Sequence, residues 1–183
     1  DGIANEPNDN ITDVDSNKTN ENSIEVDKHL FSVEITIPAA MIADKGPEQA
    51  KAEAEQEEGI SNVTINSDGS LTYKMSKATH KKMMDEMRNG LNETIGEMIN
   101  GGDYPSIKDI KPNGSYTSFT ITVNKEDFEN SLDAFAAFNL GIGSMFYQVF
   151  DGANAETMKA TIHIEDSDTG EIFNTIVYPD DLN

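Results

Sequence analysis

The feature of this sequence that most constrains its fold is a run of nineteen residues with a single charged side chain. Residues 132–150 read LDAFAAFNLGIGSMFYQVF, and Asp133 is the one charge there, in a chain with 34 acidic and 13 basic residues. Wound as a helix, the segment 128–150 carries large apolar side chains over more than half of its circumference. We therefore expect a core helix that is buried on most sides. The remaining strip holds small and polar residues, namely Asp133, Ala137, Gly141, Ser144 and Gln148.

The same run could instead form a membrane span or the wall of a ligand pocket. A membrane span needs about 20 nearly unbroken apolar residues, whereas this run keeps a strip of small and polar residues beneath a charged first turn. The pattern therefore favours a core helix. Gly141 and Gly143 weaken a helix, so we expect them to allow close packing or to mark a kink near residue 141.

From residue 29 onwards the chain alternates between strand and helix patterns. Apolar residues with a period of two predict a strand in 30–37 and strand–turn–strand pairs in 60–75, 106–123 and 157–179. Pro47 and Gly59 bound a surface helix, and Ser76 begins a longer helix with one apolar face. The order predicts the α+β class, with a mostly antiparallel sheet of about seven strands and two long helices packed on one face.

Composition divides the chain into two parts. Residues 1–28 contain eight acids, two lysines and no aromatic residue, so they cannot bury enough apolar surface to fold and are predicted to be a disordered acidic leader or tether. Residues 29–183 are predicted to form a single α+β domain. The absence of cysteine excludes disulfides and thiolate chemistry. The net charge of −21 argues against binding to nucleic acid or to an anionic membrane surface.

Catalytic and metal-binding motifs are not recognisable in the sequence. The three histidines lie outside any metalloprotease pattern, and no serine lies in a Gly-x-Ser-x-Gly elbow. The acidic segment EDSDTGE, residues 165–171, has its glycine at the fifth position from Asp166 rather than the sixth, so it favours a hairpin turn over a calcium loop. We predict no catalytic residue, no metal site and no cofactor.

Two polar residues are candidate ligand-binding residues. Asn139 lies within the apolar arc of the core helix, where an unpaired amide costs about 1–3 kcal/mol. It is expected to bond a strand backbone group or a buried water, with a ligand contact as the alternative. His80 lies one turn before Met84 and Met87 with Met83 beside it, a soft set of ligands suited to Cu(I). The alternative for His80 is an ordinary methionine-rich core helix.

Three segments carry a resemblance to a known family. ITIPA, EEGISNVTINSDGSLTYKMSKATHKKMM and EIFNTIVYPDD are similar to segments of the uncharacterised exported lipoproteins of anaerobic Gram-positive bacteria. The resemblance covers about residues 29–183, and its motifs are structural rather than catalytic. It implies an extracellular, cell-surface location through an N-terminal lipid anchor on a cysteine outside this sequence. It implies no catalytic or binding residue.

The expected function is that of a non-enzymatic, cell-surface-tethered domain that binds an extracellular peptide, glycan or envelope protein. The alternative is a carrier of a small ligand or a soft metal ion, using Asn139 or His80. An interaction domain predicts an exposed apolar patch or an uncovered sheet face. An enzyme is the third hypothesis, and it requires a deep pocket with converging carboxylates of shifted pKa.

Overall fold

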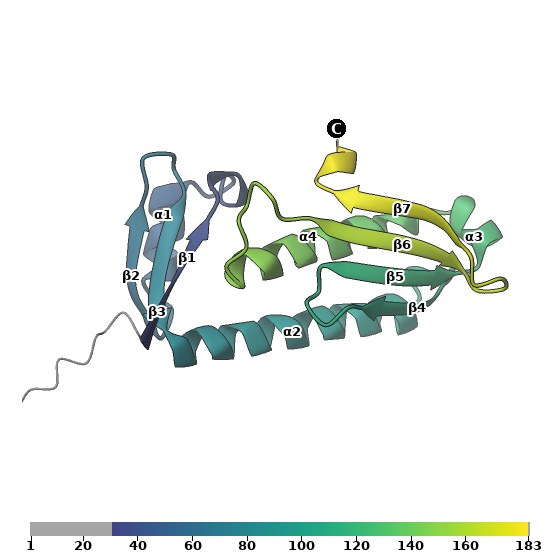
Figure 1. Cartoon of the computed structure of the whole chain (residues 1–183), viewed down its shortest axis with the longest axis horizontal. Helices are drawn as coiled ribbons and strands as arrows, with labels where there is room; N and C mark the ends of the chain where they lie inside the picture. The colour runs from purple at the N-terminus through teal and green to yellow at the C-terminus, as the bar shows by residue number, and fades with distance from the viewer. Residues whose placement is uncertain (1–30, 183) are drawn as a thin grey trace, which may run out of the picture.

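The computed structural model describes residues 31–182, so the predicted leader at residues 1–28 lies outside the described residues. The described part is α+β, with seven strands and four α-helices (Figure 1). Its strands form two sheets of three and four strands. The predicted single sheet of about seven strands is therefore wrong. The helix count also differs, because the short helix α3 adds to the predicted surface helix and the two long helices.

The N-terminal sheet is antiparallel, with the strand order β1-β3-β2. A turn containing Gly69, whose φ is +82°, joins β2 to β3 and confirms the first predicted hairpin. Helix α1 packs on β2 and β3 by burying Ala50 and Ala54, as expected for a surface helix that offers only alanines. The elements of this part are β1 (Ser32–Ile37), the 3-10 helix η2 (Ala39–Met41), α1 (Pro47–Ala54), β2 (Ile60–Ile65) and β3 (Leu71–Ser76).

The C-terminal sheet has the order β4-β5-β6-β7 and contains one parallel pair, β5 with β6. The connection between these two strands runs through α3 and α4, and a crossover of this length is what parallel pairing needs. The other pairs of the sheet are antiparallel, as predicted from the hairpins. The elements of this part are β4 (Ile107–Pro112), β5 (Ser118–Val123), α3 (Lys125–Glu129), α4 (Ala134–Phe150), β6 (Ala160–Asp166), β7 (Ile172–Tyr178) and the 3-10 helix η3 (Asp180–Leu182).

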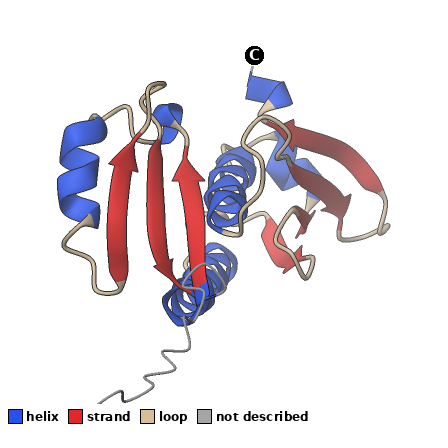
Figure 2. Ribbon diagram, turned by 60° about the vertical axis from the view of Figure 1, so that its left-hand side comes forward, coloured by secondary structure: helices blue, strands red, loops and turns tan. Residues whose placement is uncertain are grey.

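Helix α2 (Lys77–Asn100) explains why the strands do not form one sheet. Its 24 residues extend about 36 Å at a rise of about 1.5 Å per residue. Strand β4 turns back along α2 for only 6 residues, about 20 Å, so it does not reach β3 at the other end of the helix. Consequently α2 and α4 lie between two separate sheets (Figure 2).

The predicted helix over 128–150 is interrupted near residue 130. Helix α3 is capped by Asn124, whose side chain accepts a hydrogen bond from the Asp127 amide. Helix α4 then starts after Asp133, which is buried and accepts hydrogen bonds from the Ser106 amide and hydroxyl at 2.8 and 2.5 Å. The prediction of one continuous helix is therefore wrong, because Asp133 is bound to the residue that precedes β4.

The strip of small and polar residues on helix α4 faces the core. Ala137, Gly141 and Ser144 are buried. A Cβ atom on Gly141 would overlap the ring of Tyr178 at the end of β7, so this glycine allows the close packing that was predicted. The helix is continuous through residue 141. Burial on most sides is wrong for the opposite face, where several large apolar side chains are exposed.

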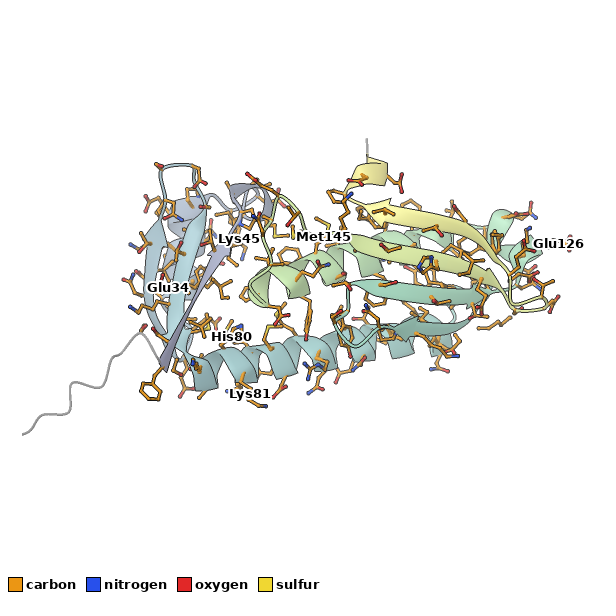
Figure 3. All side chains as sticks on the ribbon, viewed as in Figure 1. Glu34, Lys45, His80, Lys81, Glu126 and Met145 are labelled. Atoms are coloured by element: carbon orange, nitrogen blue, oxygen red, sulfur yellow. The ribbon has the colours of Figure 1, made fainter. Side chains whose placement is uncertain are left out.

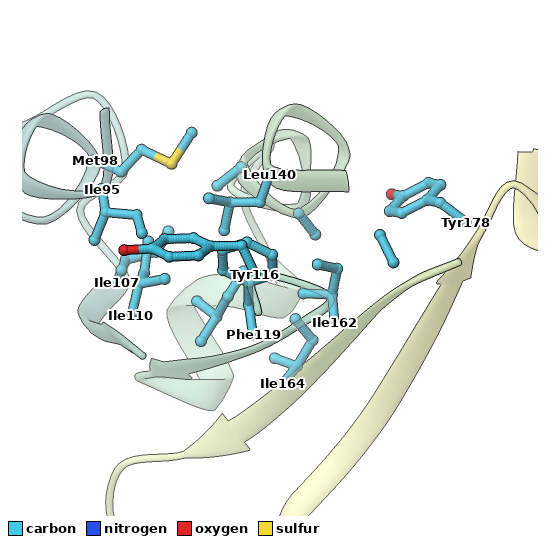
Figure 4. Packing of buried hydrophobic residues seen from close by; sticks show 14 of the residues in the cluster. Ile95, Met98, Ile107, Ile110, Tyr116, Phe119, Leu140, Ile162, Ile164 and Tyr178 are labelled. Carbon is cyan, nitrogen blue, oxygen red and sulfur yellow. The ribbon is translucent and has the colours of Figure 1, made fainter. Parts of the chain in front are cut away.

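Buried apolar residues form three clusters, one large and two small. The larger core lies between the C-terminal sheet, α2 and α4, where Phe119, Leu140 and Ile162 are at most 1% exposed (Figure 4). The predicted apolar face of α2 contributes to it through Met84, Ile95 and Met98. Smaller clusters lie beside the N-terminal sheet. Within residues 31–182, the helices are all too short or too polar to cross a bilayer.

Candidate functional site

Asn139, the first candidate residue, lies on the surface. Its side-chain amide is exposed and donates a hydrogen bond to the Tyr104 hydroxyl at 3.1 Å. The expectation that it is buried against a strand or a water is wrong, because the part of the apolar arc that contains Asn139 faces outwards. A contact between Asn139 and a ligand remains a prediction.

His80, the second candidate residue, ties the start of α2 to the end of α4. Its Nε2 lies 2.7 Å from the carbonyl oxygen of Phe150, so in the neutral ring this nitrogen carries the proton and Nδ1 is unprotonated. Figure 3 shows His80 where α2 meets the N-terminal sheet. Asn139 is eleven residues before Phe150 on α4, about 16 Å along the axis, so the two candidates do not form one site.

The methionines near His80 separate into different clusters. Met84 is 5% exposed and belongs to the larger core, whereas Met83 packs with the cluster beside the N-terminal sheet. Across the described residues, no group of three or more His, Asp or Glu side chains is arranged to hold a metal ion. A soft-metal site at His80 remains a prediction, in which methionines would supply the other ligands.

The outward face of α4, together with Leu132 two residues before the helix, forms an apolar surface, here called the α4 surface. Leu132, Phe135 and Ile142 are 76%, 58% and 39% exposed. Between α4 and η2 this surface is hollowed by a groove of about 270 Å³ lined only by apolar side chains. The spacing of three or four residues places all of these side chains on one face of the helix. The α4 surface comprises Leu132, Phe135, Phe138, Ile142, Met145 and Phe146, with Ala40 and Met41 across the groove.

A second hollow, here called the Tyr73 cleft, lies where α1, the segment after η2 and the ends of α2 and α4 meet β3. Its volume is about 440 Å³, within the range of roughly 300–1,000 Å³ that is usual for ligand sites. Met41 borders both this cleft and the groove on the α4 surface. The lining residues are Met41, Ile42, Asp44, Lys45, Ala50, Glu53, Ala54, Glu57, Tyr73, Met83 and Phe150.

Aromatic rings and charged groups occupy different parts of the Tyr73 cleft. The rings of Tyr73 and Phe150 are 6.4 Å apart and meet edge to face at 73°. Lys45 Nζ donates to Glu53 Oε2 at 2.5 Å. This hydrogen bond raises the pKa of Lys45. The pKa of Glu53 is lowered by the same bond and then by one from Gln49. Both groups are therefore charged at neutral pH.

Tyr73 lines the same cleft as this ion pair. Burial raises the pKa of Tyr73, and the negative charge of Glu53 adds to the effect. The phenol is therefore neutral at physiological pH and available as a hydrogen-bond donor or acceptor. The cleft thus combines an aromatic wall, a neutral hydroxyl and a charged edge.

Other carboxylates with a shifted pKa are stabilised as anions. Hydrogen bonds from the hydroxyl and then the amide of Ser70 lower the pKa of Asp68. A hydrogen bond from Lys81 lowers the pKa of Asp85. A general acid needs a raised pKa, so the shifts at Asp68 and Asp85 suit ion pairing rather than proton donation.

Two further surfaces are polar. A hollow of about 460 Å³ lies between β1 and the loop after α4, with Glu34, Asp68 and Glu156 among its lining residues. The outward side chains of the C-terminal sheet bond one another, as in the contact of 3.0 Å between the Thr122 hydroxyl and Glu165. Both surfaces present charged or hydroxyl side chains, whereas the groove on the α4 surface is lined only by apolar ones.

Sequence reasoning missed the α4 surface because it assigned large apolar side chains to the core by default. The strip of small residues was the signal that could have located it. A helix packs closely on a sheet through small residues, and the large side chains opposite them are then left outside. The Tyr73 cleft had no such signal, since its lining residues come from five separate segments.

Comparison of the chain with protein-family models, with curated proteins and with solved structures found no significant match. The resemblance to exported lipoproteins therefore remains a prediction. The candidate sites rest on the geometry alone.

Proposed function

We propose that this chain is a non-enzymatic binding domain that holds an apolar segment of another protein against the α4 surface. The exposure of Leu132, Phe135 and Ile142 on one helix face carries the proposal. Soluble monomers rarely expose contiguous apolar area of this kind unless it is used for binding. Full burial of such a side chain stabilises a complex by about 1.5–3 kcal/mol before association costs.

The chemistry of the partner follows from charge. With a net charge of −21, two copies of this chain repel each other, and a segment with basic residues beside its apolar ones is attracted. An apolar surface also suits a peptide or an envelope protein better than a glycan, whose hydroxyl groups need polar partners. In this proposal the domain works outside the cell on an N-terminal lipid anchor, as the resemblance to exported lipoproteins implies.

Site-specific photo-crosslinking tests the proposal. A photoreactive side chain at Ile142 is compared with one at Thr175, an exposed residue on the polar face of β7. After mixing with an envelope extract, position 142 is expected to yield a discrete adduct that position 175 does not. The adduct is expected to disappear in Phe135→Asp, which places a charge on the α4 surface while leaving the core intact.

Equal adducts at both positions, or an adduct that persists in Phe135→Asp, would contradict docking on α4. Mass spectrometry of the adduct then identifies the crosslinked segment. The proposal requires that segment to contain apolar residues at helical or alternating spacing with Lys or Arg nearby.

A specific observation also favours the carrier hypothesis, which is a second candidate function. The Tyr73 cleft has the volume of a ligand site and is lined by rings and thioethers. Neither Asn139 nor His80 lines this cleft. In a carrier that uses the cleft, the candidate binding residues are therefore the lining residues of the cleft instead of Asn139 and His80.

A further inference from the structure

We propose that the Tyr73 cleft binds a small organic cation, an amine carried on an aromatic or branched apolar body. The inference does not depend on docking at the α4 surface, because the two occupants use different side chains apart from Met41. It assigns to the cleft a class of ligand defined by three features of its wall.

The first feature is the apolar wall. Tyr73 and Phe150 come from β3 and α4, and Met83 comes from α2, so three elements supply a surface for a flat or branched apolar group. Rings in edge-to-face contact leave one ring face accessible to a third group. Thioethers are polarizable and adapt to the shape of an aromatic ligand. The walls therefore favour an apolar body of modest size.

The second feature is the sign of the charge at the edge. Asp44, Glu53 and Glu57 line the cleft, and Lys45 is the one basic side chain among its lining residues. Lys45 is already paired with Glu53 at 2.5 Å, which leaves Asp44 and Glu57 in excess. Neither of these two forms an ion pair among the described side chains. A cation is therefore favoured over an anion of the same shape.

The third feature is the position of the phenol. Tyr73 lines the cleft together with Lys45 and Glu53, while its ring lies 6.4 Å from that of Phe150. An ammonium group at this edge meets carboxylates, a phenol oxygen and the electron-rich face of a ring together. Cation–π contact adds to the ionic attraction where the ring is partly buried.

Indole compounds give a direct test because the chain contains no tryptophan. Tryptamine is titrated with the full chain and followed by the fluorescence anisotropy of its own indole. Tryptophol and indole-3-propionate serve as neutral and anionic ligands with the same ring. Saturable binding of tryptamine is expected, with affinity at least about threefold above tryptophol and further above indole-3-propionate. Equal affinities for the three ligands, or no saturation, would overturn the proposal.

Matched variants place the binding in the cleft. Tyr73→Leu and Glu57→Gln are each expected to weaken tryptamine binding by about threefold or more, whereas Tyr73→Phe keeps the ring and most of the affinity. Glu58→Gln removes the same charge from the neighbouring residue, which does not line the cleft, and is expected to bind as the parent does. If Glu58→Gln lost as much affinity for tryptamine as Glu57→Gln, the effect would come from the net charge of the chain alone. That result would overturn the assignment of the binding to the cleft.

Methionine methyl NMR supplies a second readout that does not depend on a variant folding. Met41 and Met83 line the cleft, whereas Met98 is buried in the larger core. Tryptamine is expected to shift the methyl signals of Met41 and Met83 and to leave Met98 unchanged. Shifts confined to Met145, on the α4 surface, would assign the amine to that surface and overturn the cleft. Ile142→Asp is expected to keep tryptamine binding, so failure of α4 docking and failure of this inference remain distinguishable.

Discussion

The two faces of α4 are both rich in apolar residues, yet they have opposite environments. The inner face presents Ala136, Ala137 and Gly141 to the C-terminal sheet and buries all three. The outer face presents Phe135 and Ile142 to solvent at 58% and 39% exposure. Packing between a helix and a sheet is limited by the closest approach of their backbones, so the smaller residues occupy the contact. The large residues on the other face stay exposed, and this exposure is the basis of the proposed binding surface.

Truncation of one large side chain on each face gives the largest expected difference. Leu140→Ala removes a side chain that is 1% exposed and is expected to lower the free energy of unfolding by about 3 kcal/mol. Phe135→Ala removes a larger side chain that is 58% exposed, and is expected to cost about 0.5 kcal/mol. Urea unfolding of both variants checks the pair. Similar losses in the two variants would mean that Phe135 is packed and that the α4 surface is not free.

Enlarging a small residue on the inner face tests the packing limit. Gly141→Leu forces the ring of Tyr178 to move, because even a Cβ atom at this position overlaps it. A loss of about 2 kcal/mol is expected despite the better helix propensity of leucine. Ala134→Leu, at an exposed position of the same helix, is the control and should be nearly neutral. A Gly141→Leu variant as stable as the parent would show that α4 is not held closely on the sheet.

The hydrogen bond at the end of α4 is expected to have a smaller effect. His80→Ala removes the bond of 2.7 Å to the Phe150 carbonyl and should lower the free energy of unfolding by about 1 kcal/mol. His163→Ala removes an exposed bond of 3.1 Å to Thr175 and is the matched control, expected to cost less. Thermal unfolding of both variants measures the difference. A greater loss in His163→Ala would mean that the His80 contact does not hold α4 to α2.

The smallest effect is expected at the Glu53–Lys45 pair, which lines the Tyr73 cleft. The pKa of Glu53 is held below its ordinary value of 4.5 by hydrogen bonds from Lys45 and Gln49. Its stabilisation is therefore present above pH 4.5 and is lost as the pH falls through the lower folded value. Urea midpoints of the parent and Glu53→Gln should differ slightly at neutral pH and converge in acid. A gap that widens in acid would contradict this sign.

The sequence was most informative at helix caps and turns, where a single residue determines the local backbone structure. Ser76 caps α2 by accepting a hydrogen bond from the Thr79 amide, and Asn124 caps α3 in the same way. Gly69 adopts positive φ in the predicted hairpin turn. Both the caps and the turn involve residues within a few positions of one another, so a local pattern was enough to predict them.

Sequence reasoning failed where the outcome depended on distant residues. Asp133 was placed in the small and polar strip of a continuous helix over 128–150, but Ser106 binds its carboxylate across 27 positions of the chain. The expected burial of Asn139 was wrong for the same reason, since it was placed inside because its helical neighbours are apolar. Periodicity shows which residues share a helix face, but not which face meets the sheet.

The sequence alone determined the α+β class, the identity of the seven strands and the helical state of residues 134–150, because hydrophobic periodicity, caps and turns are short-range properties. Tertiary structure decided the division into two sheets, the orientation of α4 and the meeting of Tyr73 with Phe150. The length of α2 separates the sheets, and close contacts such as that between Gly141 and Tyr178 set which face of α4 meets the sheet. Both depend on volumes filled by residues far apart in the chain, which no local pattern encodes.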